Sequence, residues 1–135
     1  MVNVAIIILN WNNSELTLKA AKSIIWQNNI VTKVIIADNG STDCSYDQLK
    51  LLPKIDLLKF NCNYGFAGGN NRAVKYAMSR YNPEYVLLLN NDAELEGNAL
   101  NILFDNCEKA DILSPKIYYG DRKTLWSCGG KIDLW

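Results

Sequence analysis

Amide and carboxylate side chains follow three short apolar segments of the sequence. Asn10 and Asn12 come after the first segment, Asp38 and Asn39 come after the second, and residues 90–92, Asn-Asn-Asp, follow a later one. In an open parallel sheet, ligands bind at the carboxyl ends of the strands, so these groups are predicted to line one binding site. Asn and Asp also form ordinary turns, and that alternative stays open for each loop taken alone.

A nucleotide is the ligand that these residue types favour. Trp11 offers a flat apolar face on which a base or ribose stacks. Asp38 or Asn39 is a candidate acceptor for the N3–H of a pyrimidine, and the glycine-rich segment 65–69 allows a ligand to approach the backbone closely. Asp92 provides a carboxylate oxygen, a ligand that Mg²⁺ and Mn²⁺ prefer. A cation at Asp92 would offset the charge of a diphosphate.

Several other kinds of site are excluded. The sequence contains no histidine, which removes Ser-His-Asp and Cys-His catalysis and imidazole-bound zinc. It contains neither GxxxxGK[ST] nor GxGxxG, so the common ATP and NAD sites are not expected. The four cysteines form no CxxC pair and are interpreted as reduced thiols. Lys+Arg 14 balances Asp+Glu 14, so the basic excess of a non-specific nucleic-acid binder is missing, and no nucleic-acid partner is expected.

The chain length indicates one domain. With 135 residues, 49% of them hydrophobic, the chain is long enough for one domain with a core and too short for two. The longest apolar run, 4–9, is far shorter than the roughly 20 residues that span a bilayer. We therefore predict a single soluble domain over residues 1–135. The apolar pattern that ends at Trp135 without a cap or polar tail favours a chain truncated at its C-terminus.

The apolar segments are predicted to be strands of a mostly parallel sheet with flanking helices. Their continuous rather than alternating apolarity is typical of strands buried on both faces. The expected strands cover residues 4–9, 33–38, 55–60, 85–89 and 112–118, with one or two short strands within 124–135. Helical patterns cover residues 14–27, 45–52 and 97–107, and another helix follows the Gly/Asn-rich loop 61–71. Strands that alternate with helices indicate an α/β fold with right-handed crossovers.

Four segments resemble the motifs of a known enzyme family. In chain order they are IIILNWN, VIIADNGSTD, NYGFAGGNN and VLLLNNDAE. Together they resemble family 2 glycosyltransferases, most closely the bacterial rhamnosyltransferase-like branch that builds cell-surface polysaccharides. The resemblance extends over nearly the whole chain, including SPKIYYG and SCGGKI.

The resemblance implies a Rossmann-like GT-A fold in which residues 1–135 are the nucleotide-sugar-binding (donor) part. The implied reaction is inverting, metal-assisted transfer of a sugar from a UDP- or dTDP-sugar to a glycan or lipid-linked acceptor. The implied cofactor is Mg²⁺ or Mn²⁺. The nucleotide-binding residues implied are Asn10, Trp11, Asn12, Asp38, Asn39, Gly65, Gly69, Asn70, Asn90 and Asn91, and the metal ligand is Asp92. Residues 90–92 stand for a DxD-type motif with only one carboxylate.

The general base is left unassigned. In inverting members a carboxylate in the later half of the family's sequence deprotonates the acceptor hydroxyl, and no carboxylate here matches that motif. The base is therefore expected outside this chain, and these residues alone are expected to be inactive. The resemblance implies a cytoplasmic protein, with peripheral association at the inner face of the membrane left open.

Two alternatives remain at the level of sequence. One is a non-catalytic nucleotide-binding module of the same fold that acts as a sensor or partner subunit. The other is a flavodoxin- or receiver-like domain with Asp38 as phosphoacceptor. The second alternative is weaker, because such a domain needs an acidic cluster after its first strand and residues 10–13 carry amides there.

Overall fold

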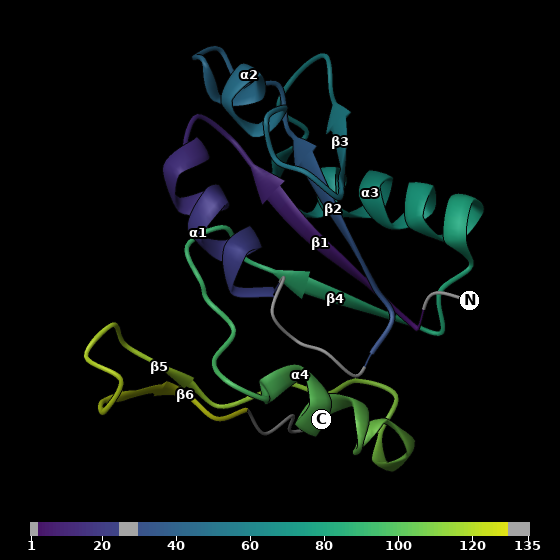
Figure 1. Ribbon diagram of the computed structural model, residues 1–135, viewed down its shortest axis with the longest axis vertical. Coiled ribbons are helices and arrows are strands. Elements are labelled where there is room, and N and C mark those ends of the chain that lie inside the picture. Colours follow the sequence, from purple (N-terminus) through teal and green to yellow (C-terminus); the bar gives the residue numbers. More distant parts are fainter. Residues whose placement is uncertain (1–2, 25–29, 130–135) are drawn as a thin grey trace, which may run out of the picture. The chain divides into compact units, whose positions relative to one another are not determined.

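The computed structural model describes residues 3–24 and 30–129 (Figure 1). Contacts divide the chain into two compact units, residues 1–96 and residues 97–135. The first unit contains a parallel sheet, and the second contains short helices and a small antiparallel sheet. Each unit is described by itself.

A four-stranded parallel sheet forms the centre of the first unit. Its strands are β1 (Val4–Asn10), β2 (Thr32–Asp38), β3 (Ile55–Lys59) and β4 (Tyr85–Leu89), in the order β3-β2-β1-β4. Each begins and ends within one residue of the bounds predicted from the sequence. The expected fold class, an α/β domain with a mostly parallel sheet, is confirmed. Since β1 lies between β2 and β4, the strand order reverses direction between β1 and β4.

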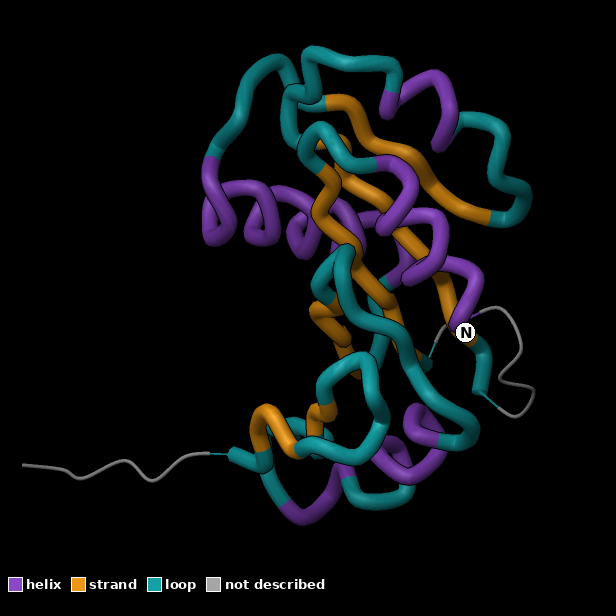
Figure 2. Tube along the Cα trace, turned by 90° about the vertical axis from the view of Figure 1, so that its left-hand side faces the viewer, coloured by secondary structure: helices purple, strands orange, loops and turns teal. Residues whose placement is uncertain are grey.

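Helices cover both faces of this sheet. α1 (Ser14–Ile24) lies on one side and α3 (Gly65–Tyr81) on the other, and the short α2 (Ser45–Leu49) follows β2 (Figures 1 and 2). Beneath α3, side chains with no exposed surface form a compact core: Ala5, Ile7, Ile35, Ala37, Ala73 and Ala77. The small alanines of α3 let its backbone approach the sheet closely. The predicted helix over 14–27 is confirmed as far as Ile24, and residues 25–27 lie outside the described residues.

The start of α3 differs from the prediction. Residues 61–71 were expected to form a loop, but the chain is helical from Gly65 onward. A Cβ atom on Gly69 would lie 2.6 Å from Leu9 Cδ1, so this glycine allows the helix to pack against β1. Glycine disfavours a helix by about 1 kcal/mol relative to alanine. The packing of α3 on β1 outweighs the low helix propensity of these glycines. The Gly/Asn-rich composition of residues 61–71 therefore led to the wrong prediction of a loop from Gly65 onward.

A polar cluster joins α3 to the sheet. Lys33 Nζ lies 2.6 Å from Asp56 Oδ1, and Tyr76 donates a hydrogen bond of 2.8 Å to Asp56 Oδ2. Tyr81 donates to the same oxygen. Burial raises the pKa of Asp56, but the bonds from Lys33, Tyr81 and Tyr76 outweigh it and leave this pKa below its usual value. The hydrogen bond to Asp56 raises the pKa of Lys33.

Asp56→Asn is expected to lower the free energy of unfolding by about 2 kcal/mol at pH 7, because a hydrogen-bonded ion pair is lost. A carboxylate with a lowered pKa adds stability above its unfolded pKa of about 3.9, and that stability disappears as the pH falls through the folded value. Urea unfolding between pH 2.5 and 7 should therefore show a steeper acid loss for the wild type than for the variant. Equal acid slopes would contradict this role for Asp56.

The second unit contains fewer regular elements. They are α4 (Ala99–Phe104), a 3₁₀ helix η1 (Cys107–Lys109), and the antiparallel strands β5 (Ile117–Tyr118) and β6 (Leu125–Ser127). The strand expected over 112–118 is wrong for 112–116, where Pro115 has no N–H for a strand ladder and Ile112 is 89% exposed. Of the strands expected within 124–135, β6 is present, and residues 130–135 lie outside the described residues. No helix in the described ranges is long and apolar enough to cross a bilayer.

Candidate functional site

The carboxyl ends of β1 and β4 form the topological switch point of the sheet. The chain runs from β1 outward to β2 and β3, and then crosses to the other side of β1 to form β4. The loops that leave β1 and β4 therefore diverge, and an open α/β sheet binds its ligands in the crevice between such loops. This is the place in the first unit where the fold predicts a ligand.

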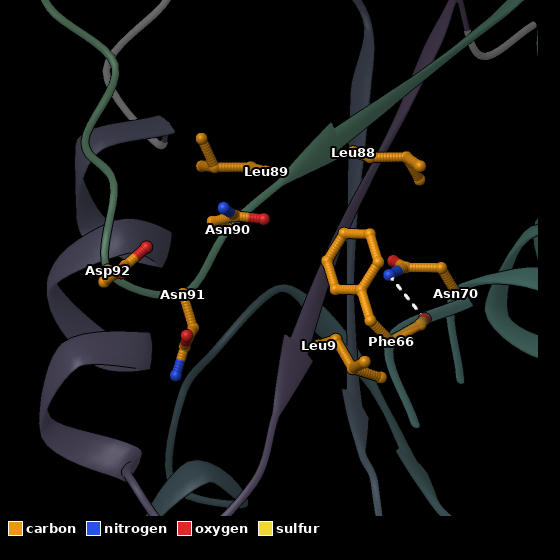
Figure 3. A pocket seen from close by; sticks show the side chains of 8 residues that line it. All are labelled: Leu9, Phe66, Asn70, Leu88, Leu89, Asn90, Asn91 and Asp92. Atoms are coloured by element: carbon orange, nitrogen blue, oxygen red, sulfur yellow. Dashed lines mark hydrogen bonds between the residues drawn. The ribbon is translucent and has the colours of Figure 1, made fainter. Parts of the chain in front are cut away.

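An open cavity of about 200 Å³ lies at this point (Figure 3). Its apolar lining consists of Leu9, Phe66, Leu88 and Leu89, and its polar lining consists of Asn70, Asn90, Asn91 and Asp92. Figure 3 shows residues 90–92 on one side of the cavity and Phe66 and Asn70 of α3 on the other. Four of the eleven residues predicted to bind nucleotide or metal thus come together around one cavity.

The Asn-Asn-Asp segment forms a tight turn directly after β4. The Ala93 N–H donates a hydrogen bond of 3.1 Å to the Asn90 carbonyl oxygen, which closes the turn. Asn90 and Asp92 are exposed, whereas Asn91 is half-buried and donates from Nδ2 to Thr17 Oγ1 over 3.3 Å. The turn therefore presents a carboxylate and an amide to solvent while a second amide anchors it to α1.

The first turns of α3 form the opposite wall. Asn70 is 4% exposed, and its Nδ2 donates a hydrogen bond of 2.9 Å to the Phe66 carbonyl oxygen. This bond holds the Asn70 side chain against the first turn of α3. The ring of Phe66 is 62% exposed beside it. An exposed aromatic ring beside buried polar groups is suited to contact a flat or apolar part of a ligand.

Asn10 and Asp38 lie beneath the surface rather than on it. Both are fully buried, and Asn10 Nδ2 donates to Asp38 Oδ1 over 2.8 Å. Asp38 also accepts hydrogen bonds from the Ser41 hydroxyl and the Ser41 N–H. A phosphoacceptor carboxylate must be reached by a phosphoryl donor, so the buried Asp38 does not support the receiver-like alternative.

Asn39 is also held inside the protein. It is 2% exposed, and its Oδ1 accepts a hydrogen bond of 3.0 Å from the Tyr64 N–H. Its Nδ2 donates to Asn63 Oδ1 over 2.9 Å and to the Gly65 carbonyl oxygen over 3.3 Å. Asn39 thus fixes the entry into α3, and one lone pair of Oδ1 is left for a further donor.

Trp11 and Asn12 are the exposed members of the predicted set near β1. The ring of Trp11 is 54% exposed. Asn12 has a positive φ of 51°, and its Oδ1 accepts a hydrogen bond of 2.8 Å from the Thr42 N–H. Asn12 therefore holds the loop after β2, and Trp11 is free to offer a ring face.

The two glycines of the predicted set serve different purposes. Gly65 has a φ of +70° at the start of α3, and a Cβ there would meet no atom within 4 Å. Gly69 is buried, and a Cβ there would overlap the Leu9 side chain and come within 3.2 Å of Asn39 Nδ2. Gly65 therefore allows a turn, and Gly69 allows close packing beneath the cavity.

Gly69→Ala is expected to reduce ligand binding more than stability. Its methyl group would push Leu9 into the cavity, whereas the gain of about 1 kcal/mol in helix propensity offsets part of the steric cost. The matched control is Gly68→Ala in the same helix, where the Cβ would meet Tyr64 Cβ at 3.1 Å and not Leu9. Thermal unfolding and nucleotide titration of both variants test this. Equal binding losses would show that the Leu9 contact is irrelevant.

A model of the Glycosyl transferase family 2 domain matches residues 5–127 of the chain. The chain belongs to glycosyltransferase family 2. The matched region contains the parallel sheet except for its first residue, Val4, and all the residues that line the cavity. Membership of the family, which the four sequence motifs predicted, is thereby confirmed.

Several known proteins are similar to this chain in sequence or in fold. The low-salt glycan biosynthesis hexosyltransferase Agl10 of Haloferax volcanii is 27% identical over 122 residues, which cover 85% of this chain and 36% of Agl10. The S. aureus TarS 1-349 structure in complex with UDP superimposes with a TM-score of 0.68 at 18% identity, over 80% of this chain and 32% of that one.

A second solved structure with a similar fold is that of the mannosyltransferase PcManGT from Pyrobaculum calidifontis in complex with GDP-Man and Mn²⁺. It superimposes with a TM-score of 0.58 at 20% identity, over 70% of this chain and 29% of that one. The chain thus spans about a third of the length of each of these three proteins. The solved structures confirm the GT-A type of fold.

The donor atoms around the cavity suit a cation that arrives with a nucleotide. Asp92 is the carboxylate in the cavity lining, and in the described ranges no three Cys, Asp or Glu side chains group to hold a metal. Mg²⁺ is commonly held by one or two carboxylates together with substrate phosphates. Asp92 with an amide oxygen of Asn90 or Asn91 fits that pattern.

Sequence reasoning missed several residues in and around the candidate site. Phe66 and the leucines of the cavity wall were assigned to loop or strand, and Ser41 and Thr17 were not singled out. The hydroxyl of Ser41 joins Asn10, Asn12 and Asp38. Thr17 was detectable as a polar residue on the buried face of α1, which it shares with Ser14, Ala20, Ala21 and Ile24, because a buried hydroxyl requires a partner.

Proposed function

We propose that residues 1–135 are the donor-binding part of an inverting, metal-assisted glycosyltransferase. The enzyme would transfer a hexosyl group, with rhamnosyl as the first candidate, from a UDP- or dTDP-sugar to a glycan or lipid-linked acceptor. The observation that carries the proposal is the cavity at the switch point, where Asp92 and three amides lie beside apolar walls. Such a combination suits a ribose and diphosphate next to an apolar ring or sugar face.

Three relatives support a nucleotide-sugar donor. One is named a hexosyltransferase, and two others are described in complex with UDP-GlcNAc and with GDP-Man. The family match and these relatives favour an enzyme over the non-catalytic module. The bacterial rhamnosyltransferase-like branch stays a prediction, since Agl10 is archaeal.

We assign the base and the diphosphate to different parts of the site. Ligand pockets usually measure about 300–1,000 Å³, so a cavity of about 200 Å³ holds only part of a nucleotide sugar. Trp11 is the proposed stacking surface, and the remaining lone pair of Asn39 Oδ1 is the proposed acceptor for a pyrimidine N3–H. Because Asn39 is 2% exposed, the loop that covers it must shift when the base enters.

Asp92, with an amide oxygen of Asn90 or Asn91, is proposed to hold Mg²⁺ or Mn²⁺ against the donor diphosphate. A bound divalent cation offsets the charge that develops on the nucleoside diphosphate leaving group. The residues of this chain bind the donor and orient it, and the base that deprotonates the acceptor is proposed to lie outside them. A cytoplasmic location at the inner face of the membrane, where lipid-linked acceptors are found, rests on the family resemblance.

Calorimetric titration of the 135-residue chain tests the proposal. UDP, dTDP, GDP and NAD are titrated with and without Mn²⁺, and circular dichroism verifies that the sample is folded. We expect Mn²⁺-dependent binding of UDP or dTDP and no binding of NAD. Absence of binding by both pyrimidine nucleotides in a folded sample would contradict the donor-binding assignment.

A further inference from the structure

A series of buried and partly buried hydrogen bonds, called here the hydrogen-bond chain, connects the carboxyl ends of three neighbouring strands. Asn91 Nδ2 donates to Thr17 Oγ1 over 3.3 Å, and Thr17 Oγ1 donates to Asn10 Oδ1 over 2.7 Å. Asn10 Nδ2 in turn donates to Asp38 Oδ1 over 2.8 Å. This hydrogen-bond chain therefore runs from the turn after β4, through Thr17 of α1, to the carboxyl ends of β1 and β2.

Asp38 sets the direction of every bond in this chain. A carboxylate only accepts hydrogen bonds, so the Asn10 side chain must turn its Nδ2 toward Asp38 and its Oδ1 toward Thr17. The single hydroxyl hydrogen of Thr17 is then directed to Asn10, which leaves Thr17 Oγ1 to accept from Asn91. Asn91 is consequently held with its nitrogen toward α1.

The Thr17 hydroxyl has an alternative acceptor nearby, and a bond to it would interrupt the hydrogen-bond chain. Its Oγ1 also lies 2.9 Å from the Asn13 carbonyl oxygen, one helical turn earlier, and a threonine within a helix commonly bonds to that carbonyl. Asn10 Oδ1 competes for the same hydrogen. Since Thr17 and Asn10 are both fully buried, loss of the Thr17 hydroxyl would leave the Asn10 oxygen without this partner.

We infer that Thr17 is a positioning residue that fixes the Asn91 amide and, through it, the turn that carries Asp92. Its importance for donor binding rests on the function proposed above. Two hydrogen bonds attach the segment after β4 to α1. Asn91 Nδ2 donates to Thr17 Oγ1, and the Leu95 N–H donates to Ser23 Oγ farther along the same helix. Thr17 thus links the turn at the metal position to the buried Asn10–Asp38 pair.

Thr17→Val and Thr17→Ser form the decisive pair of variants. Valine keeps the shape of threonine and removes the hydroxyl, whereas serine keeps the hydroxyl and removes the methyl group. The direct measurement is the side-chain NH₂ resonance of Asn91 in ¹H–¹⁵N spectra of the full chain. We expect this resonance to shift in Thr17→Val and to stay near its wild-type position in Thr17→Ser.

UDP titration with and without Mn²⁺ provides the functional measurement. We expect Thr17→Val to lose at least fivefold in UDP affinity with Mn²⁺ present and to change less than twofold without the metal, while Thr17→Ser retains wild-type values. Ala20→Gly in the same buried face of α1 serves as the stability-matched control. A general loss of stability would weaken Ala20→Gly and Thr17→Val alike.

The possible results distinguish a failure of the proposed function from a failure of the inference about Thr17. If the wild-type chain binds no pyrimidine nucleotide, the proposed function fails, and the donor-site role of Thr17 fails with it. If the wild type binds UDP but the Asn91 resonance is unchanged in Thr17→Val, the inference about Thr17 is overturned and the proposed function stands. Should Thr17→Val not fold, hydrogen exchange of the Asn91 side-chain NH₂ in the wild-type chain decides: exchange slower than that of the exposed Asn90 amide supports the Thr17 bond, and equally fast exchange overturns it.

Discussion

Asp92→Ala is expected to abolish the Mn²⁺-dependent part of UDP binding. The affinity measured with Mn²⁺ should fall about tenfold or more, because the loss of a charged interaction costs about 1.5–3 kcal/mol. Asp92 is exposed, so the variant should keep the thermal stability of the wild type. Isothermal titration of UDP with and without Mn²⁺ measures the effect.

Two neighbouring positions serve as controls for Asp92. Glu94→Ala removes an exposed carboxylate that does not line the cavity, and it should bind UDP like the wild type. Asn90→Asp adds a second carboxylate to the turn and should strengthen Mn²⁺-dependent binding severalfold. If Glu94→Ala lost as much affinity as Asp92→Ala, general electrostatics rather than a ligand role of Asp92 would explain the loss.

Gly40→Ala is expected to produce a large loss of stability, about 2–5 kcal/mol. Gly40 has a φ of +72°, and a left-handed conformation costs a non-glycine residue about 1–2 kcal/mol. A Cβ at this position would also lie 2.4 Å from the Cys62 carbonyl carbon. That atom belongs to the backbone, so the overlap must displace a loop, which costs about 1–3 kcal/mol more. Urea unfolding monitored by circular dichroism measures the loss.

Gly65→Ala isolates the backbone contribution. Gly65 has nearly the same φ, +70°, but a Cβ there would meet no atom within 4 Å. Its expected loss is only the conformational cost of about 1–2 kcal/mol. Equal losses for the two variants would show that the approach of Cys62 to Gly40 contributes nothing to stability.

The sequence predicted the sheet closely because burial leaves a local signature. β1 and β2 lie between two other strands and are covered by helices, so a continuous apolar run is required at both. The beginning of α3 has no such signature. Its glycines have low helix propensity, and the requirement for small residues comes from Leu9, which is distant in the sequence.

The candidate site was predicted as a set of residues but not as an arrangement. Residue types at strand ends and the four family motifs were enough to select Asp92, its neighbouring amides and Asn70. They could not separate Asn39, which is buried, from Asn90, which is exposed. Both are asparagines that follow an apolar strand, and only the packing around each strand end distinguishes them.

By itself, the sequence determined the α/β class, the family and the strand ends where polar groups gather. Buried strands appear in it as continuous apolar runs, and the family motifs are short contiguous segments in a fixed order. Only the tertiary structure decided which polar groups line the cavity and which are buried in the fold. β4 is an edge strand, and Asn90 and Asp92 in the turn after it are exposed to solvent. β1 and β2 are central strands, and Asn10 and Asp38 at their carboxyl ends are buried. The role of Thr17 is likewise a tertiary property, since its hydroxyl meets Asn91 across 74 positions of the chain.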